Sequence, residues 1–129
     1  MIKQAVALPF RFGKDGALEV LLVTTRGKGR WILPKGKIDQ GWRPAETAAA
    51  EAFEEAGVSG AILEPPIAES IATGWGRVSV HAIQVERVLD EWPEMGQRER
   101  RWVAIDDGVE MVTDKGLQQL LNRVATEGL

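Results

Sequence analysis

The chain has 129 residues, with 16 lysine and arginine residues, 19 acidic residues and a formal net charge of -3. This length excludes a two-domain enzyme and leads us to expect a single domain over residues 1–129. The acidic balance excludes a broad positive field, so we expect neither a nucleic-acid polymer nor a membrane surface as partner. The chain has no cysteine, which excludes disulfides, thiolate zinc sites and cysteine nucleophiles. Carboxylates and a single histidine, His81, remain as metal-binding and acid–base groups.

The N-terminal region carries no signal of a targeting segment. Residues 1–12 contain no apolar stretch followed by small residues, and no part of the chain approaches the ~20 apolar residues that span a membrane. We therefore expect a cytoplasmic protein.

The first half of the chain predicts a hairpin, a short strand and a helix. Residues 4–12 and 18–25 are rich in valine, leucine and phenylalanine, and the glycines between them suit a tight reversal. Residues 31–33 form a brief apolar strand before Pro34, which prevents a helix. Residues 44–56 are rich in alanine and glutamate, with proline at the first position and glycine just past the end. This composition predicts a helix.

The second half predicts three more strands and a final helix. Residues 67–73, 78–88 and 101–105 have β-type composition. Asp114 can cap a helix in which leucine and valine recur every three or four residues, at Leu117, Leu120, Leu121 and Val124. The order of three strands, a helix, three strands and a helix predicts an α/β fold with a mixed β-sheet between helices.

The helix predicted over residues 44–56 carries a cluster of carboxylates. At about 100° per residue, Glu51, Glu54 and Glu55 fall within an arc of about 100°, so they share one face. No lysine or arginine on the helix relieves their repulsion, and the macrodipole disfavours acids near the helix C-terminus. Two interpretations remain open, a solvated acidic face and a divalent-cation site. The opposite side is small or apolar and is expected to contact a sheet: Ala49, Ala52, Phe53 and Ala56.

The segment before this helix is basic, although the whole chain is acidic. No acidic residue lies between Val20 and Ile38, and the glycines of this segment leave backbone N–H groups accessible to phosphate oxygens. A solvated flexible loop is the alternative interpretation. Beside an acidic helix face, the segment suits a Mg²⁺-bridged polyphosphate. The predicted substrate-binding cations are Arg26, Lys28, Arg30, Lys35 and Lys37.

Residues 36–58 read GKIDQGWRPAETAAAEAFEEAGV and resemble the Nudix box, whose pattern is G-x5-E-x7-R-E-U-x-E-E-x-G-U, with U a bulky aliphatic residue. The spacing fits without a gap. Trp42 stands at the first glutamate of the pattern, Ala50 at the arginine and Ala52 at the aliphatic position. The matching positions are Gly36, Glu51, Glu54, Glu55, Gly57 and Val58.

The segments that flank this region are similar to those of the diphosphoinositol-polyphosphate-phosphohydrolase-like branch of the Nudix hydrolases. The resemblance implies an α/β/α sandwich in which the box forms a loop, a helix and a loop. It also implies bound Mg²⁺ or Mn²⁺, and hydrolysis of a diphosphate by water attacking phosphorus. The flanking segments are Leu8-Pro9-Phe10-Arg11, Thr24-Thr25-Arg26, Trp31-Ile32-Leu33-Pro34-Lys35-Gly36 and Arg101-Trp102-Val103.

The resemblance implies roles for individual residues of the box. Glu51 and Glu55 would be the principal metal ligands, and Glu54 would be a further ligand or an orienting group. Any of the three could act as a catalytic base. Gly36, the first residue of the pattern, joins the predicted metal site. Ala50 removes the arginine that would lie beside Glu54.

Residues other than the matching box positions are further candidates. Arg43 or Arg77 could supply the missing guanidinium. Glu94 or Glu99 could supply another carboxylate from a polar loop, with ordinary surface charge as the alternative. Trp42 or Trp75 could stack on a base, whereas Trp31 and Trp102 are expected to lie in the core. His81 is expected to be structural or solvent-facing.

These patterns together predict a metal-dependent pyrophosphohydrolase that cleaves a diphosphate linkage in a small polyphosphate. Diphosphoinositol polyphosphates and dinucleoside polyphosphates rank first as substrates, and other nucleotides remain open. The alternative is a catalytically silent Nudix domain that binds a nucleotide or polyphosphate as a sensor. We expect a monomer or a homodimer.

Overall fold

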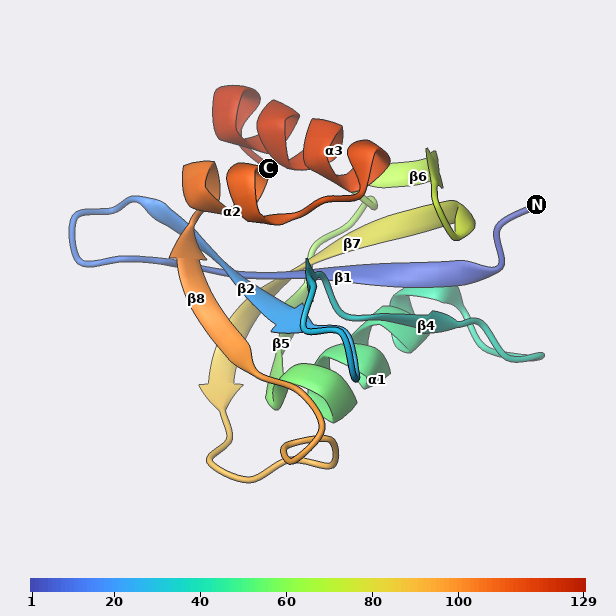
Figure 1. Cartoon of the computed structure of the whole chain (residues 1–129). Helices are drawn as coiled ribbons and strands as arrows, with labels where there is room; N and C mark the ends of the chain where they lie inside the picture. Colours follow the sequence, from blue (N-terminus) through green and yellow to red (C-terminus); the bar gives the residue numbers. More distant parts are fainter.

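The computed structural model describes residues 1–129 and places a mixed β-sheet between two layers of helix (Figure 1). Helix α1 (Pro44–Ala56) covers one face, and α2 (Ile105–Met111) and α3 (Lys115–Glu127) cover the other. The predicted α/β/α arrangement is confirmed. The eight-stranded sheet has the order β3-β2-β1-β7-β5, with β4 paired to β1, β6 to β7 and β8 to β2. Its strands are β1 (Gln4–Phe12), β2 (Leu18–Thr24), β3 (Trp31–Ile32), β4 (Lys35–Lys37), β5 (Val58–Ile62), β6 (Ala68–Thr73), β7 (Gly76–Val88) and β8 (Arg100–Ala104).

Strand β1 lies at the centre of the sheet. It pairs parallel with β7 and antiparallel with β2 and β4. Its side chains alternate between two cores: Ala5 and Ala7 pack with α1, whereas Val6 and Leu8 pack with α3. Because the residues that face α1 are small, this helix lies close to β1. The same packing brings α1 beside β4, where Gly36 pairs with Ala5.

Helix α1 has the bounds that the sequence predicts. Pro44 is its first residue, and Gly57 follows it with φ 66°, donating its N–H to the carbonyl groups of Ala52 and Phe53. The prediction that Phe53 contacts the sheet is wrong, because this side chain is 41% exposed. The buried face instead turns toward the acidic arc, so the two overlap. It consists of Thr47, Ala48, Ala52, Glu55 and Ala56.

Three short elements were not predicted, namely β4, β5 and α2. The three residues of β4 include no large apolar side chain, and this strand forms because its backbone pairs with β1. Ile105, predicted as a strand residue, is the first residue of α2. Short strands leave little pattern in the sequence, because they form through backbone pairing with a neighbouring strand and not through the β propensity of their own residues.

Helix α3 confirms its predicted cap and apolar face. The side chain of Asp114 accepts a hydrogen bond from the Leu117 N–H at 3.0 Å. The predicted apolar positions are buried against the sheet: Leu117, Leu120, Leu121 and Val124. None of the helices is both long and apolar enough to cross a membrane.

The single histidine is part of the interior of the protein. His81 is 2% exposed on β7, and its Nε2 lies 2.8 Å from the hydroxyl oxygen of Ser79. Its Nδ1 has no hydrogen-bond partner. Burial lowers the pKa of His81, which favours the neutral ring. Of the two positions expected for this residue, structural or solvent-facing, the structural one fits.

The β5–β7 pairing generates a stability prediction. A Cβ on Gly60 would overlap the carbonyl oxygen of Gln84, beside the irregular register between Ser59 and Gly60. We expect Gly60→Ala to lower the free energy of unfolding by about 1–3 kcal/mol, because the added methyl group overpacks the strand pair. Gly96→Ala is the matched control, since a Cβ there meets nothing within 4 Å. Urea unfolding measures both variants, and equal midpoints would contradict this packing.

Candidate metal and phosphate site

Two glutamates of α1 meet strand β4. Glu51 lies against Gly36, where any Cβ would overlap the Glu51 carboxyl group, so glycine alone fits without a shift. Glu55 lies one turn further along the helix and is only 3% exposed. It accepts a hydrogen bond from the Lys35 backbone N–H at 3.4 Å. The structure therefore brings Gly36, Glu51 and Glu55 together.

The guanidinium group of Arg98 also contacts Glu55. Its Nη2 lies 3.8 Å from Glu55 Oε2, while its Nε donates to Glu94 Oε1 at 2.7 Å. Of the two carboxylates considered outside the box, Glu94 thus lies beside the cluster. No contact joins the exposed side chain of Glu99 to it.

Burial controls the ionisation of this cluster. Burial, followed by a hydrogen bond with Glu51, raises the pKa of Glu55 to about 8, although the charge of Arg98 opposes the shift. Burial also raises the pKa of Glu51, and the charges of Glu54 and Glu94 act in the same direction. At neutral pH the metal-free pair therefore retains a proton. A divalent cation would displace that proton and relieve the repulsion.

The loop between β7 and β8 is docked on the C-terminal turn of α1. The Glu94 N–H donates to the Glu54 carbonyl at 3.0 Å, and Trp92 Nε1 donates to the Glu55 carbonyl at 3.1 Å. Arg100 donates to the Ala56 carbonyl at 2.9 Å and lies 3.8 Å above the Trp92 ring. The last turn of α1 has no basic residue of its own, so Arg100 supplies the positive charge that a helix C-terminus favours.

The predicted phosphate-binding cations lie on two segments: Lys35 and Lys37 on β4, and the other three on the loop between β2 and β3. Lys35 belongs to the carboxylate cluster: Glu55 and Glu51 counteract the lowering of its pKa by burial, and its Nζ lies 4.3 Å above the Trp75 ring. Lys37 lies at the other end of β4, beside a small hollow next to α1. The remaining cations are exposed on the loop between β2 and β3, where Arg26 donates to Gln97 at 2.9 Å; they are Arg26, Lys28 and Arg30.

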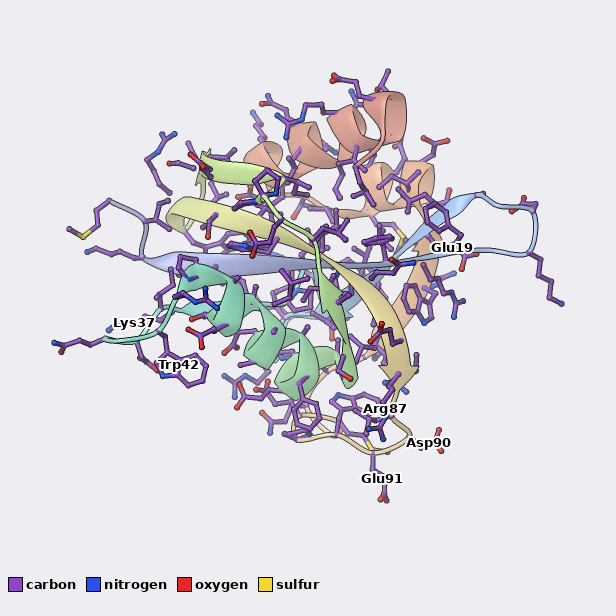
Figure 2. The ribbon with its side chains drawn as sticks, turned by 180° about the vertical axis from the view of Figure 1, so that it is seen from behind. Glu19, Lys37, Trp42, Arg87, Asp90 and Glu91 are labelled. Atoms are coloured by element: carbon purple, nitrogen blue, oxygen red, sulfur yellow. The ribbon has the colours of Figure 1, made fainter.

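Two of the three non-consensus positions, Trp42 and Ala50, lie at one place in the structure, whereas the third, Ala52, is buried in the core. Trp42 and Ala50 both line a hollow of about 180 Å³ that Glu51 and Glu54 also border. Trp42 is 51% exposed and lies near Lys37, by the end of α1 away from Arg87, Asp90 and Glu91 (Figure 2). The missing box arginine therefore leaves open space on this side of the helix.

The alternative arginines considered for the Ala50 position are engaged elsewhere. Arg43 pairs with Glu46 at 3.5 Å at the start of α1. Arg77 donates to the hydroxyl oxygen of Ser70 at 2.6 Å. Neither arginine contacts Glu54, so the structure does not support the suggestion that one of them replaces the box arginine.

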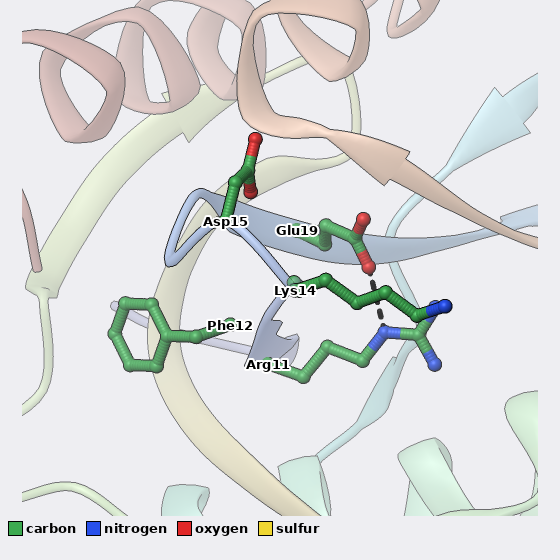
Figure 3. A pocket seen from close by; sticks show the side chains of 6 residues that line it. Arg11, Phe12, Lys14, Asp15 and Glu19 are labelled. Carbon is green, nitrogen blue, oxygen red and sulfur yellow. Dashed lines mark hydrogen bonds and ion pairs between the residues drawn. The ribbon is translucent and has the colours of Figure 1, made fainter.

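A separate hollow of about 710 Å³ lies on the turn between β1 and β2 (Figure 3). Arg11 and Glu19 form an ion pair of 2.7 Å at its wall, and the neighbouring Phe12, Lys14 and Asp15 line the rest. It contains none of the box glutamates. This larger surface hollow is therefore outside the candidate site, despite its volume.

The donor set fits a hard divalent cation. No group of three acidic or histidine side chains is already arranged around one point. Mg²⁺ does not require such a group, because one or two carboxylates with water and substrate phosphates suffice. The neighbouring oxygens of Glu51 and Glu55, with the glycine backbone of Gly36 beside them, meet this requirement.

Sequence reasoning missed the residues that support the cluster from the β7–β8 loop and the start of β8: Trp92, Arg98 and Arg100. The segment has mixed charges and is mostly exposed, which is typical of an ordinary surface loop. One indirect signal was present, because an acidic helix C-terminus without its own lysine or arginine requires cations from another segment.

The sheet between helices and the loop-helix-loop over residues 36–58 define the class of fold, and similarity to known proteins specifies the family. A model of the NUDIX domain matches residues 1–121. "Nudix hydrolase 12, mitochondrial" of Arabidopsis thaliana is 33% identical over 119 residues, which cover 81% of this chain and 57% of the plant protein. Human "Diphosphoinositol polyphosphate phosphohydrolase 3-alpha" is 31% identical over 114 residues, covering 85% of this chain and 68% of that protein. The chain belongs to the Nudix hydrolase family.

Solved structures of the same fold extend over nearly the whole chain. An Ap4A hydrolase binary complex from C. elegans has a TM-score of 0.69 at 20% identity, covering 98% of this chain and 96% of that one. A structure from a study of MutT from Aliivibrio salmonicida and Vibrio cholerae has a TM-score of 0.68 at 15% identity, covering 96% of this chain and 98% of that one. At these identities the likeness concerns the fold.

The raised pKa of Glu55 generates a prediction for the metal-free protein. Between the ordinary carboxyl pKa and about 8, the folded state binds more protons at Glu55 than the unfolded chain does. The free energy of unfolding should therefore fall as the pH rises from about 5 to about 8. Glu55→Gln should flatten this dependence, whereas Glu69→Gln, an exposed site on β6, should not. Thermal unfolding in EDTA measures the slopes, and identical slopes for wild type and Glu55→Gln would contradict the assignment.

Proposed function

We propose that this protein is a divalent-metal-dependent pyrophosphohydrolase that cleaves a diphosphate linkage in a small polyphosphate. The observation that carries the proposal is the meeting of Glu51 and Glu55 at Gly36, in a chain of the Nudix hydrolase family. The buried carboxylates repel each other unless a proton or a cation is present. A metal-dependent reaction gives this unfavourable arrangement a function.

Glu51 and Glu55 would hold Mg²⁺ or Mn²⁺, with Glu54 as a further ligand or orienting group and Gly36 as the adjoining backbone. When bound, the metal neutralises charge on the diphosphate and lowers the pKa of its bound water. Glu55 is fixed by the Lys35 N–H and by Arg98, so its carboxylate is preorganised. Glu54 is exposed at the edge of the cluster, where it can accept a proton from the attacking water.

The basic residues indicate where the substrate phosphates would lie. Lys35 is beside the carboxylates, and Lys37 is next to the hollow that Glu51 and Glu54 border. Cations on both sides of a metal site can hold a polyphosphate across it. The exposed loop that carries Arg26, Lys28 and Arg30 would contact phosphates further from the bond that breaks.

For the substrate class, we rank diphosphoinositol polyphosphates and dinucleoside polyphosphates first. Relatives named as a diphosphoinositol polyphosphate phosphohydrolase and an Ap4A hydrolase support this order. Nucleoside triphosphates and ADP-ribose remain open as further candidates. We further propose that the protein acts in the cytoplasm, as a monomer or a homodimer, without a nucleic-acid or membrane partner.

A substrate panel tests the activity. With Mg²⁺ or Mn²⁺, the purified protein should release phosphate or a mononucleotide from at least one diphosphoinositol phosphate, dinucleoside polyphosphate or nucleotide. EDTA should abolish the release, because the carboxylates alone do not neutralise the diphosphate. Product analysis and kcat/KM give the preferred class. Inactivity across the panel with both metals would reject the proposal.

The metal ligands have their own test. Glu51→Gln and Glu55→Gln should each lower kcat by orders of magnitude, because an amide has nearly the same shape but is a poorer Mg²⁺ ligand. Glu69→Gln serves as the matched control on the distant strand β6. Steady-state kinetics at saturating Mg²⁺, with thermal unfolding to verify folding, make the comparison. Near wild-type kcat in either variant would remove that residue from the metal site.

The silent polyphosphate sensor remains the second candidate, because Trp42 and Ala50 replace charged residues of the box. In a working enzyme, Ala50→Arg should leave activity similar or raise it, since the arginine would lie beside Glu54 and have open space in the hollow. In a sensor, activity should be at background in both forms. Calorimetry that shows tight, metal-dependent ligand binding without product after long incubation would favour the sensor.

A further inference from the structure

Arg98 connects three separate parts of the fold. Its Nη1 donates to the Thr24 carbonyl of β2 at 3.0 Å, its Nε donates to Glu94 Oε1 at 2.7 Å, and its Nη2 lies 3.8 Å from Glu55 Oε2. The side chain is only 9% exposed. A guanidinium that is buried to this extent, with each nitrogen directed to a different segment, has a fixed orientation.

The side of α1 that carries Ala50 has no guanidinium comparable to that of Arg98. Ala50 occupies the position of the box arginine and lines an open hollow. Arg43 and Arg77 bind Glu46 and Ser70 instead. Among the side chains that contact the acidic cluster, Arg98 is therefore the guanidinium available to orient a carboxylate.

We propose that Arg98 is a positioning residue for the metal-binding carboxylates, holding Glu55 of the box and Glu94 of the β7–β8 loop in a fixed relative arrangement. The inference rests on the proposed function, since it assigns Arg98 to the same metal site. The arginine acts from the loop, on the Glu55 side of α1, and not from the helix itself. Its anchor on Thr24 ties both carboxylates to the rigid strand β2.

The chemistry of the guanidinium explains why arginine suits this position. A lysine presents one ammonium on a flexible stem and lacks the planar set of nitrogens that reaches Thr24, Glu94 and Glu55 at once. The formal charges of the region also balance: four carboxylates, which do not converge on one point, and the two cations Arg98 and Lys35 leave a formal charge that one divalent ion neutralises. The carboxylates are Glu51, Glu54, Glu55 and Glu94.

Arg100 provides a control for a purely structural role. It lies two residues further along the chain, at the start of β8, and binds the carbonyl groups of Ala56 and Leu89, at 2.9 and 2.7 Å, and the ring of Trp92. It contacts no carboxylate of the cluster. Loss of Arg100 should therefore weaken the docking of the loop on α1 without removing a partner of Glu55 or Glu94.

The first test measures Mn²⁺ binding by calorimetry without substrate, so its readout does not depend on activity. Arg98→Met should raise the Kd for Mn²⁺ by about 10- to 100-fold, the usual effect of losing a residue that orients metal ligands. Arg98→Lys should recover only part of the loss. Arg100→Met should lower the unfolding temperature yet keep the wild-type Kd, and Arg101→Met, at an exposed site of β8, should change neither.

A double-variant comparison separates positioning from general stability. If Arg98 acts through Glu94 and Glu55, then Arg98→Met in a Glu94→Gln background should raise the Mn²⁺ Kd by much less than in the wild type. A merely structural role predicts the same fold-change in both backgrounds. At saturating Mn²⁺, Arg98→Met should lower kcat with little change in KM, because the basic loop that contacts the substrate remains intact.

Two results would overturn the proposal. One is a Kd for Mn²⁺ in folded Arg98→Met that equals or is below the wild-type value. The other is an equal rise of the Kd in Arg98→Met and Arg100→Met. Should Arg98→Met fail to fold, Arg98→Lys decides, and a wild-type Kd in that variant would reject positioning. Because Mn²⁺ binding is measured without turnover, an inactive wild type would reject the proposed function and leave this test in force.

Discussion

The burial of Glu55 is the constraint on which the candidate site depends. A carboxyl group there meets three unfavourable conditions: low exposure, the neighbouring Glu51 and the negative end of the α1 dipole. The fold compensates with the Lys35 N–H on one side and Arg98 on the other. Strand β4, through the Lys35 N–H, and the β7–β8 loop, through Arg98, make this burial tolerable, while Gly36 leaves room for the neighbouring Glu51.

The loop between β7 and β8 combines two tasks that usually belong to different segments. Its Glu94 N–H and Trp92, with Arg100 at the adjoining start of β8, satisfy the last carbonyl groups of α1. It also carries the carboxylate of Glu94 and the guanidinium of Arg98 into the cluster. The contacts that cap the helix and those that place these charges are separate, since Arg98 is anchored on Thr24 and not on α1 carbonyl groups.

Local patterns in the sequence predicted the parts of this structure that depend on neighbours in the chain. Pro44, Gly57 and the glutamate spacing define α1, and Asp114 defines the start of α3. The burial of Glu55 was not predicted, because the side of α1 expected to contact the sheet was centred on Ala52, Phe53 and Ala56. Arg98 lies far from α1 in the sequence, and its contact depends on the path of β7 and β8. No local periodicity contains that information.

Trp42 and Ala50, which depart from the box pattern, lie eight residues apart in the sequence but affect only one region of the structure. Trp42 and Ala50 line one hollow, so the two replacements alter a single region beside Glu51 and Glu54. Glu55 does not border that hollow and is held from the opposite direction by Arg98. The loss of a helix arginine therefore leaves the most buried carboxylate with its partners, because its orientation comes from the sheet and the loop. On this physical ground, an altered box remains compatible with a complete metal site.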